Sequence, residues 1–309
     1  MNCLNGERFV RQAIDSVYAQ TYKNWEIVFL DNASTDATPE IAKSYDPRLR
    51  YYRNPVTVPL GRARNLALER ASGEFIAFLD ADDLWLPHKL EKQMPLFEAS
   101  PSLGLVFSDA IMRFDGQSST TTYFRRYNYK PPRGKIFGAL LTQYSIPMLT
   151  AVVRAELLHR LGHRFDDRYQ ACDDFDFFLQ LAYECECDYV DEPLASCLLH
   201  PEGTWSRLQG LGPNEMRMTL DKLRTAHPDL DTQFGGQMER MYRDVARKEA
   251  ISCWCEGHDS RAREALRPYR HEIKSLVLYC ATFLPSVGRR RLYWFVRRCL
   301  YRATMLLHR

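Results

Sequence analysis

One short stretch, an apolar segment that runs directly into a cluster of aspartates, constrains the fold more than any other part of the sequence. Residues 75–79 read Phe-Ile-Ala-Phe-Leu, and Asp80, Asp82 and Asp83 follow at once. A continuous apolar run of this length, preceded by Ser-Gly, predicts a strand that is buried on both faces. The three carboxylates then lie at the carboxyl end of a strand, where open α/β sheets bind their ligands.

The spacing of Asp80 and Asp82 indicates a site for a divalent cation. Side chains two residues apart on an extended chain point the same way, so both carboxylates face one ligand. Mg²⁺ or Mn²⁺ held by one or two carboxylates takes its remaining ligands from phosphates and water. The alternative is a solvated loop in which Asp83 caps the helix that Pro87 opens. The motifs elsewhere in the chain decide between the two.

Composition places the chain among globular proteins. Its 309 residues are 45% hydrophobic, which is enough for one large or two modest domains. No apolar run reaches the ~18 residues of a transmembrane helix. The nine cysteines form no regular framework, which indicates reduced thiols and a cytoplasmic protein.

Apolar periodicity predicts alternating strands and helices up to about residue 200. The alternation indicates an α/β fold with a mostly parallel sheet and helices on both faces. Residues 118–135 are polar, aromatic and basic, and we expect a mobile loop or short hairpin there. The expected strands are 25–31, 49–53, 75–79, 103–109, 146–153, 189–193 and 194–199, and the expected helices are 7–20, 38–44, 61–70, 155–161 and 169–182, with one more after Pro87.

The rest of the chain is predicted to be helical, so we expect domains at 1–212 and 213–309. Residues 273–309 contain eight Lys or Arg residues and no Asp or Glu. A final helix from about Arg289 would place apolar side chains on one face and most arginines on the other. This pattern predicts peripheral binding to an anionic membrane surface, at the inner face of the cell membrane. The alternative is an amphipathic helix that packs on the protein itself.

Four groups of residues form an ordered set over roughly residues 1–205. They read Asn-Gly-Glu at 5–7 with Ala-Gln-Thr-Tyr at 19–22, Asp-Asn-Ala-Ser-Thr-Asp at 31–36, Gly-Arg-Ala-Arg-Asn at 61–65 with Phe-Leu-Asp-Ala-Asp-Asp at 78–83, and Asp-Asp-Phe-Asp at 173–176. In order and spacing the set resembles the family 2 glycosyltransferases. The resemblance implies the nucleotide-diphospho-sugar transferase fold of the A type (GT-A).

The resemblance also implies roles for the residues that bind the donor. Asp31 would accept a hydrogen bond from the nucleotide base. Arg64 would approach the nucleotide and its phosphates. Asp80 and Asp82 would carry the nucleoside and a Mn²⁺ or Mg²⁺ ion, which neutralises the diphosphate. His200 would be a further ligand of the metal or phosphate, with a structural role as the alternative.

For Asp174 the resemblance implies the catalytic base, which takes the acceptor proton in a single inverting displacement. Helix capping is the alternative. The expected function is transfer of a sugar from a nucleotide-diphosphate sugar to a glycan or lipid-linked acceptor, in the synthesis of cell-surface polysaccharide or glycolipid. No nucleic-acid partner is expected. A nucleotidyltransferase and a catalytically inactive sugar- or membrane-binding relative are the competing hypotheses.

Two features depart from the family pattern. Asn32 stands where relatives often have a second aspartate, which predicts a changed nucleotide preference. The first strand of the family precedes Asn5, and only residues 1–4 correspond to it here. We therefore expect neighbouring strands to lack backbone partners, and an upstream extension of about ten residues to complete the sheet.

Overall fold

The structure is a computed structural model that describes residues 1–115, 120–162, 164–208 and 210–283. The chain divides into two units, Met1–Gln209 and Gly210–Arg309. This division lies close to the expected domain boundary after residue 212.

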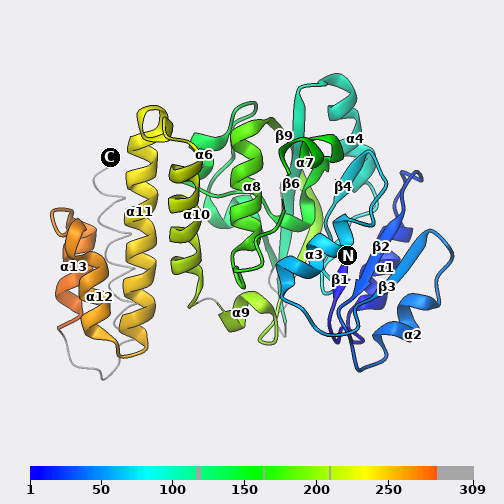
Figure 1. Ribbon diagram of the computed structural model, residues 1–309, viewed down its shortest axis with the longest axis horizontal. Helices are drawn as coiled ribbons and strands as arrows, with labels where there is room; N and C mark the ends of the chain where they lie inside the picture. The colour runs from blue at the N-terminus through cyan, green and yellow to red at the C-terminus, as the bar shows by residue number, and fades with distance from the viewer. Residues whose placement is uncertain (116–119, 163, 209, 284–309) are drawn as a thin grey trace. The chain divides into compact units, whose positions relative to one another are not determined.

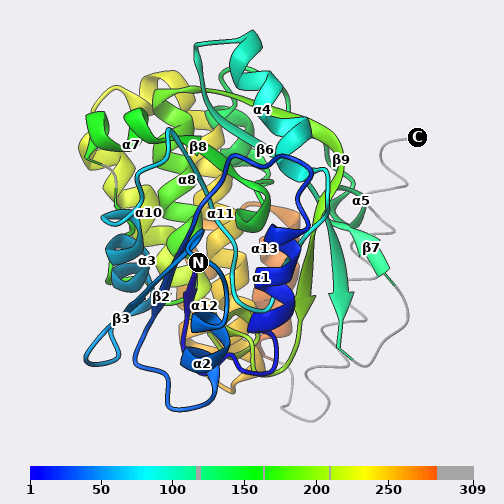
Figure 2. The same cartoon turned by 90° about the vertical axis from the view of Figure 1, so that its right-hand side faces the viewer.

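The first unit begins with a parallel sheet of three strands in the order β1–β2–β3, here called the amino-terminal sheet (Figure 1). Parallel neighbours need a crossover, and a helix supplies each one. All five residues of β2 are buried. Its sequence Ile-Val-Phe-Leu-Asp predicts burial for the four apolar residues, and the aspartate is the exception. Figure 2 shows α1 and α3 on opposite sides of β2. The elements are β1 (Asn2–Cys3), α1 (Val10–Tyr18), β2 (Ile27–Asp31), α2 (Thr38–Lys43), β3 (Leu49–Arg53) and α3 (Leu60–Leu68).

A second sheet, here called the mixed sheet, has the strand order β4–β8–β6–β9–β5, with β7 paired to β6. Its long central strands β6 and β9 run parallel, and its other pairings are antiparallel. The strands are β4 (Phe75–Ala77), β5 (Leu84–Trp85), β6 (Leu103–Phe114), β7 (Thr120–Thr122), β8 (Val152–Arg154) and β9 (Glu186–Leu199). The helices are α4 (Lys89–Ala99), α5 (Tyr123–Tyr127), α6 (Phe137–Thr142), η1 (Met148–Thr150), α7 (Ala155–Leu161), α8 (Asp173–Glu184) and α9 (Thr204–Leu208).

The α/β class is confirmed, and the strand directions correct one part of the expectation. Among the described strands, parallel pairing occurs in the amino-terminal sheet and between β6 and β9. The strand β7 pairs antiparallel with β6, and β8 pairs antiparallel with both β4 and β6. The expected strand 146–153 is also shorter, because Thr150 donates from its nitrogen and its hydroxyl to the Pro147 carbonyl oxygen and forms a 3₁₀ turn before β8.

The second unit is helical where it is described. Trp254 is fully buried in a small core with Leu266 and Leu278. The expected basic helix from Arg289 lies outside the described residues. Among the described helices, none is long and apolar enough to cross a membrane. The helices are α10 (Gly212–Ala226), α11 (Leu230–Cys255), α12 (Asp259–Leu266), η2 (Arg267–Tyr269) and α13 (Ile273–Ala281).

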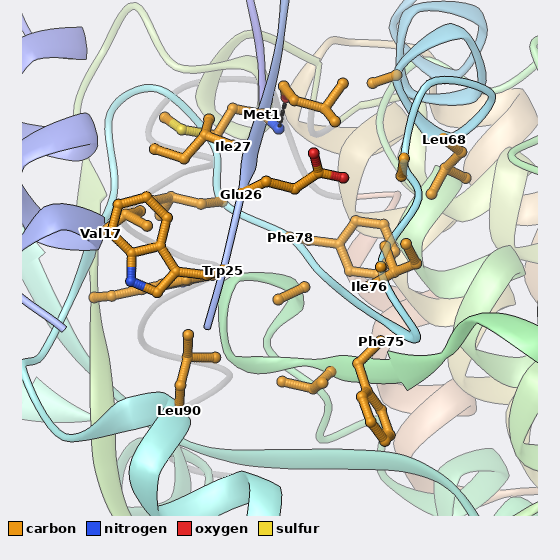
Figure 3. A pocket seen from close by; sticks show the side chains of 18 of the residues that line it. Met1, Val17, Trp25, Glu26, Ile27, Leu68, Phe75, Ile76, Phe78 and Leu90 are labelled. Carbon is orange, nitrogen blue, oxygen red and sulfur yellow. Dashed lines mark hydrogen bonds between the residues drawn. The ribbon is translucent and has the colours of Figure 1, made fainter. Parts of the chain in front are cut away.

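A cavity of about 470 Å³ lies between β1 and β4, which are the end strands of the two sheets. Figure 3 shows Trp25 and Ile27 on one side of it and Phe75 and Ile76 on the other. The Met1 nitrogen donates to the Val28 carbonyl oxygen at 2.9 Å. The register pairs Asn2 with Leu30 and Cys3 with Asp31, so the first three residues of β2 have no register partner in β1.

Candidate active site

Hydrogen bonds join the loops that follow β1 and β2, and these loops contain the first two sequence motifs. The Asn5 nitrogen donates to Ser34 Oγ at 2.9 Å, and the Gly6 nitrogen donates to Thr38 Oγ1 at 2.8 Å. In return, the Thr35 nitrogen donates to Asn5 Oδ1 at 2.8 Å. The polar residues of these motifs therefore build the rim of the amino-terminal sheet.

Asp31 ends β2 and is fully buried. Its Oδ1 accepts a hydrogen bond from the Ser34 nitrogen at 2.8 Å. Its Oδ2 accepts from Tyr51 Oη at 2.6 Å and from Arg53 Nη1 at 2.7 Å. Three protein donors therefore fill most of the acceptor sites of this carboxylate, and Oδ1, which accepts one of them, has room for one further donor. The predicted role of Asp31 in base recognition stays a prediction, and Arg53 and Tyr51 join it as candidates.

Arg64 lies on the buried face of α3 and binds two carboxylates. Its Nη2 donates to both oxygens of Asp80, at 3.0 and 3.1 Å, and its Nη1 donates to Asp173 Oδ2 at 2.5 Å. Burial lowers the pKa of Arg64, but the charges of Asp173 and Asp80 outweigh burial and raise it above its ordinary value. Arg64 therefore remains a cation inside the protein.

Asp82 and His200 come together although 118 residues separate them. The His200 Nε2 lies 3.0 Å from Asp82 Oδ2, and His200 is buried just after β9. Burial and the neighbouring charge of Asp80 raise the pKa of Asp82, while His200 opposes the rise.

Asp83 is buried and accepts a hydrogen bond from the Leu198 nitrogen at 2.9 Å, which joins this loop to β9. Its pKa is raised well above the ordinary value by burial and by the charges of Asp82 and Asp80. The helix α4 has His88 at its N-cap without a side-chain hydrogen bond. The alternative in which Asp83 caps this helix is therefore wrong.

Asp174 lies in the first turn of α8, next to Asp173. Cys172 is the N-cap residue, and no side chain caps the helix. Asp174 Oδ1 accepts from the Phe175 nitrogen at 2.8 Å. Burial first, and then the charge of Asp173, raise the pKa of Asp174 from 3.8 to about 7, against the opposing charge of Arg64. A carboxylate with this pKa is half-protonated near neutral pH, which suits a general base.

A comparison with sequence families decides the relationship that these residues suggest. The profile of "Glycosyl transferase family 2" matches residues 1–156, slightly more than half of the 309 residues. The chain belongs to glycosyl transferase family 2.

Curated relatives match shorter parts of the chain. An uncharacterized glycosyltransferase of Methanocaldococcus jannaschii is 30% identical over 193 residues, which cover 60% of this chain and 64% of the relative. The Escherichia coli enzyme WfgD, a UDP-Glc:alpha-D-GlcNAc-diphosphoundecaprenol beta-1,3-glucosyltransferase, is 41% identical over 97 residues, 31% of this chain and 38% of the relative. In both, the match spans less than two thirds of the relative.

Solved structures of low sequence identity share the fold over nearly the whole chain. Staphylococcus aureus TarS, solved with UDP-GlcNAc, has a TM-score of 0.63 and 17% identity, with 94% of this chain and 90% of that chain covered. A mannosyltransferase from Pyrobaculum calidifontis, solved with GDP-Man and Mn²⁺, has a TM-score of 0.62 and 18% identity, with 99% and 85% covered. The fold expected from the resemblance is thereby confirmed.

The metal ligands expected from the family fit the geometry in part. Within the described residues, no three acidic, histidine or cysteine side chains converge on one point. Asp82 and His200 already touch and offer one oxygen and one nitrogen, which are ligand types that Mn²⁺ accepts. Both oxygens of Asp80 face Arg64 instead. The Asp82–His200 pair therefore suits a cation that takes its other ligands from a diphosphate and water.

Proposed function

We propose that this family 2 protein is an inverting glycosyltransferase that uses a nucleotide-diphosphate sugar as donor. The observation that carries the proposal is the position of the half-buried Asp174 in the first turn of α8, where its pKa of about 7 arises beside the charges of Asp173, Arg64 and Asp80. Nucleotide sugars bound to TarS and to the Pyrobaculum mannosyltransferase support the choice of donor.

In the proposed reaction, Asp174 accepts the proton of the acceptor hydroxyl. The hydroxyl oxygen forms a bond to the anomeric carbon, and the bond from that carbon to the diphosphate oxygen breaks on the opposite side. The bonding electrons leave with the nucleoside diphosphate. A base with a pKa near 7 is deprotonated often enough to accept this proton as the new bond forms.

Asp82 and His200 are the residues that we propose to hold Mn²⁺ or Mg²⁺, with Asp80 beside them. The bound cation would stabilise the negative charge that develops on the leaving diphosphate. Arg53 at the end of β3 adds a positive charge near the expected base site, where Asp31 holds it at 2.7 Å.

The acceptor and the cellular setting are proposed from the relatives and from the sequence. WfgD by its name acts on a sugar joined to diphosphoundecaprenol, a lipid. We propose a glycan or lipid-linked acceptor, in the synthesis of cell-surface polysaccharide or glycolipid, and a peripheral location on the cytoplasmic side of the membrane. Residues 289–309, with their arginines, would supply the contact with anionic lipid.

Release of nucleoside diphosphate from a panel of nucleotide sugars tests this function. The purified chain is incubated with each donor and with mixed glycan or lipid-linked acceptors, in the presence of Mn²⁺, Mg²⁺ or excess chelator. We expect release that depends on one donor, on acceptor and on the cation. A nucleotidyltransferase would release no nucleoside diphosphate, because it forms a nucleotide sugar from a nucleoside triphosphate and a sugar phosphate, and an inactive relative would bind a donor without turnover.

Asp82→Asn is expected to lower turnover by about 10²-fold or more while the protein stays folded, because the negative charge and one of the two carboxylate oxygens beside the proposed cation are lost. Cation dependence of the residual rate and circular dichroism provide the measurement. Asp167→Asn is the matched control, since Asp167 is exposed. Full activity of Asp82→Asn in excess chelator would contradict the metal proposal.

A further inference from the structure

The guanidinium of Arg64 joins two parts of the site that come from distant segments of the chain. It donates to both oxygens of Asp80, which follows β4, and to Asp173, the first residue of α8. The bond to Asp173 spans 109 residues of sequence. A single cation therefore connects the strand end on the donor side to the helix that contains Asp174.

Burial commits Arg64 to these partners. Arg64 is 7% exposed and Asp173 is 3% exposed. A buried charge that loses its partner bears its full desolvation cost, so neither side chain can turn to a ligand without a large loss of stability. A guanidinium that is held in this way is poorly suited to bind and release the donor phosphates in every turnover.

We infer that Arg64 is a positioning residue that acts through Asp173 to hold the first turn of α8, and with it Asp174, in its reactive place. The inference rests on the proposed function, because it takes Asp174 as the base. It replaces the expected contact between Arg64 and the donor phosphates. Misplacement of a reacting group by ~1 Å can cost about 10²-fold in rate, so one remote bond has a measurable effect.

Asp173 also contributes to the charge around Asp174. Its negative charge raises the pKa of Asp174, whereas the positive charge of Arg64 lowers it. Replacing Asp173 by asparagine removes the first contribution and leaves the second, so Asp174 should titrate at lower pH. The charged and titratable groups that face Asp174 are Asp173, Arg64, Asp80, Tyr123 and Tyr144.

A double-mutant cycle on the full chain tests the inference, with Arg64→Gln, Asp173→Asn and the double variant. Arg62→Gln is the matched control, because Arg62 is exposed on the same helix. The measurements are kcat, donor KM and the acid midpoint of the pH–rate profile. We expect each single variant to lose about 10²-fold in kcat with donor KM changed less than about threefold. The double variant should be no slower than the slower single variant.

Asp173→Asn should also move the acid midpoint to lower pH, which a purely structural defect would not do. Three outcomes would overturn the inference: additive losses in the double variant, an unmoved midpoint, or a large rise in donor KM with normal kcat in Arg64→Gln. The last would make Arg64 a phosphate ligand.

If the variants are too slow to assay, unfolding by urea supplies the second measurement. In the absence of donor, the effects of the two substitutions on the free energy of unfolding should be strongly non-additive. Additive effects would show that Arg64 and Asp173 do not act as one unit and would contradict the inference. Failure of the unaltered protein to turn over any donor would refute the proposed function instead, and the unfolding cycle would still report on Arg64 and Asp173.

Discussion

Burial of Asp174 links the stability of the fold to the protonation state that catalysis needs. Its ordinary pKa is 3.8, and in the folded protein the pKa is about 7. Between these values the folded state binds more protons than the unfolded state, so this residue makes stability fall as pH rises from about 4 to about 7. The proposed base is fully ionised only above that range, where the loss of folding stability caused by its raised pKa is complete.

Asp174→Asn should therefore lose transfer by about 10²- to 10⁴-fold and gain stability at pH 8, on the order of a few kcal/mol. At pH 3 the two proteins should have similar free energies of unfolding, because Asp174 is largely neutral there in both the folded and the unfolded state. Urea unfolding at both pH values, together with the transfer assay, provides the check. Equal stability of the two proteins at pH 8 would show that the carboxyl is not strained by burial.

Lys89 is a second buried ionisable residue, and it lies away from the proposed chemistry. Its Nζ donates to Gln93 Oε1 at 2.8 Å and lies 4.3 Å from the centre of the Trp85 ring. Burial lowers its pKa from 10.5 to about 7. Between these values the unfolded state binds the extra proton, so Lys89 makes stability rise with pH.

Lys89→Met should remove this slope, which amounts to at most about 1.4 kcal/mol per pH unit. The free energy of unfolding, measured from pH 7 to pH 10, tests the expectation. Lys92→Met is the matched control on the same helix, because Lys92 is exposed and pairs with Glu192 at 2.6 Å. An unchanged slope in Lys89→Met would show that another group causes it.

Single residues were predictable from the sequence where local pattern and chemistry coincide. Asp80 and Asp82 follow a strand because an apolar run ends there, and Asp174 lies in the first turn of a helix because acidic residues precede an apolar stripe. The ion pair between Arg64 and Asp173 was not predictable, because no pattern in the neighbouring sequence of either residue indicates a contact between positions 109 residues apart. Lys89 was missed because a lysine in the first turn of a helix is usually exposed.

At the scale of elements, the cavity of about 470 Å³ between β1 and β4 leaves unfilled space beside two strands. The residues that line it include Ile27, Val28 and Phe75, and both bordering strands are at the ends of their sheets. An extended segment placed there would gain apolar contacts on both sides and backbone hydrogen bonds along β2.

An engineered extension of five residues before Met1, with the sequence Val-Thr-Val-Ile-Ile, should raise the free energy of unfolding by about 1–3 kcal/mol. The control extension is Gly-Ser-Gly-Ser-Gly, which has the same length and low strand propensity. Urea unfolding compares the three proteins. If both extensions leave the midpoint unchanged, the cavity does not accept a strand.

Most helices and strands of the first unit were predictable, because each has a clear apolar period. Strand direction was not, since the continuous apolar run at β4, which is typical of parallel sheets, belongs to a strand that pairs antiparallel with β8. The separation into two sheets was not predictable either, because it depends on whether β1 pairs with β4, which is a tertiary contact that these two strands do not make here.

At the scale of the whole chain, every residue of the proposed site lies within the first unit, Met1–Gln209. A protein of residues 1–209 should therefore unfold cooperatively and release nucleoside diphosphate from its donor. Calorimetry and the donor assay test this, with the full chain as reference. Aggregation of the shortened protein, or loss of donor turnover, would show that residues 210–309 are required for the fold or the site.

The order of pairing in the mixed sheet has a consequence for synthesis on the ribosome. The loop of Asp80–Asp83 lies between β4 and β5, whose partners are β8 and β9. A nascent chain that has emerged up to Leu103 contains the acidic loop but none of these partner strands, and no Asp173 for Arg64. At about 5–20 residues per second, the ~100 residues still required take roughly 5–20 seconds. During that interval the chain exposes apolar strand edges beside carboxylates without their native partners, which makes it a substrate for chaperones that bind nascent chains.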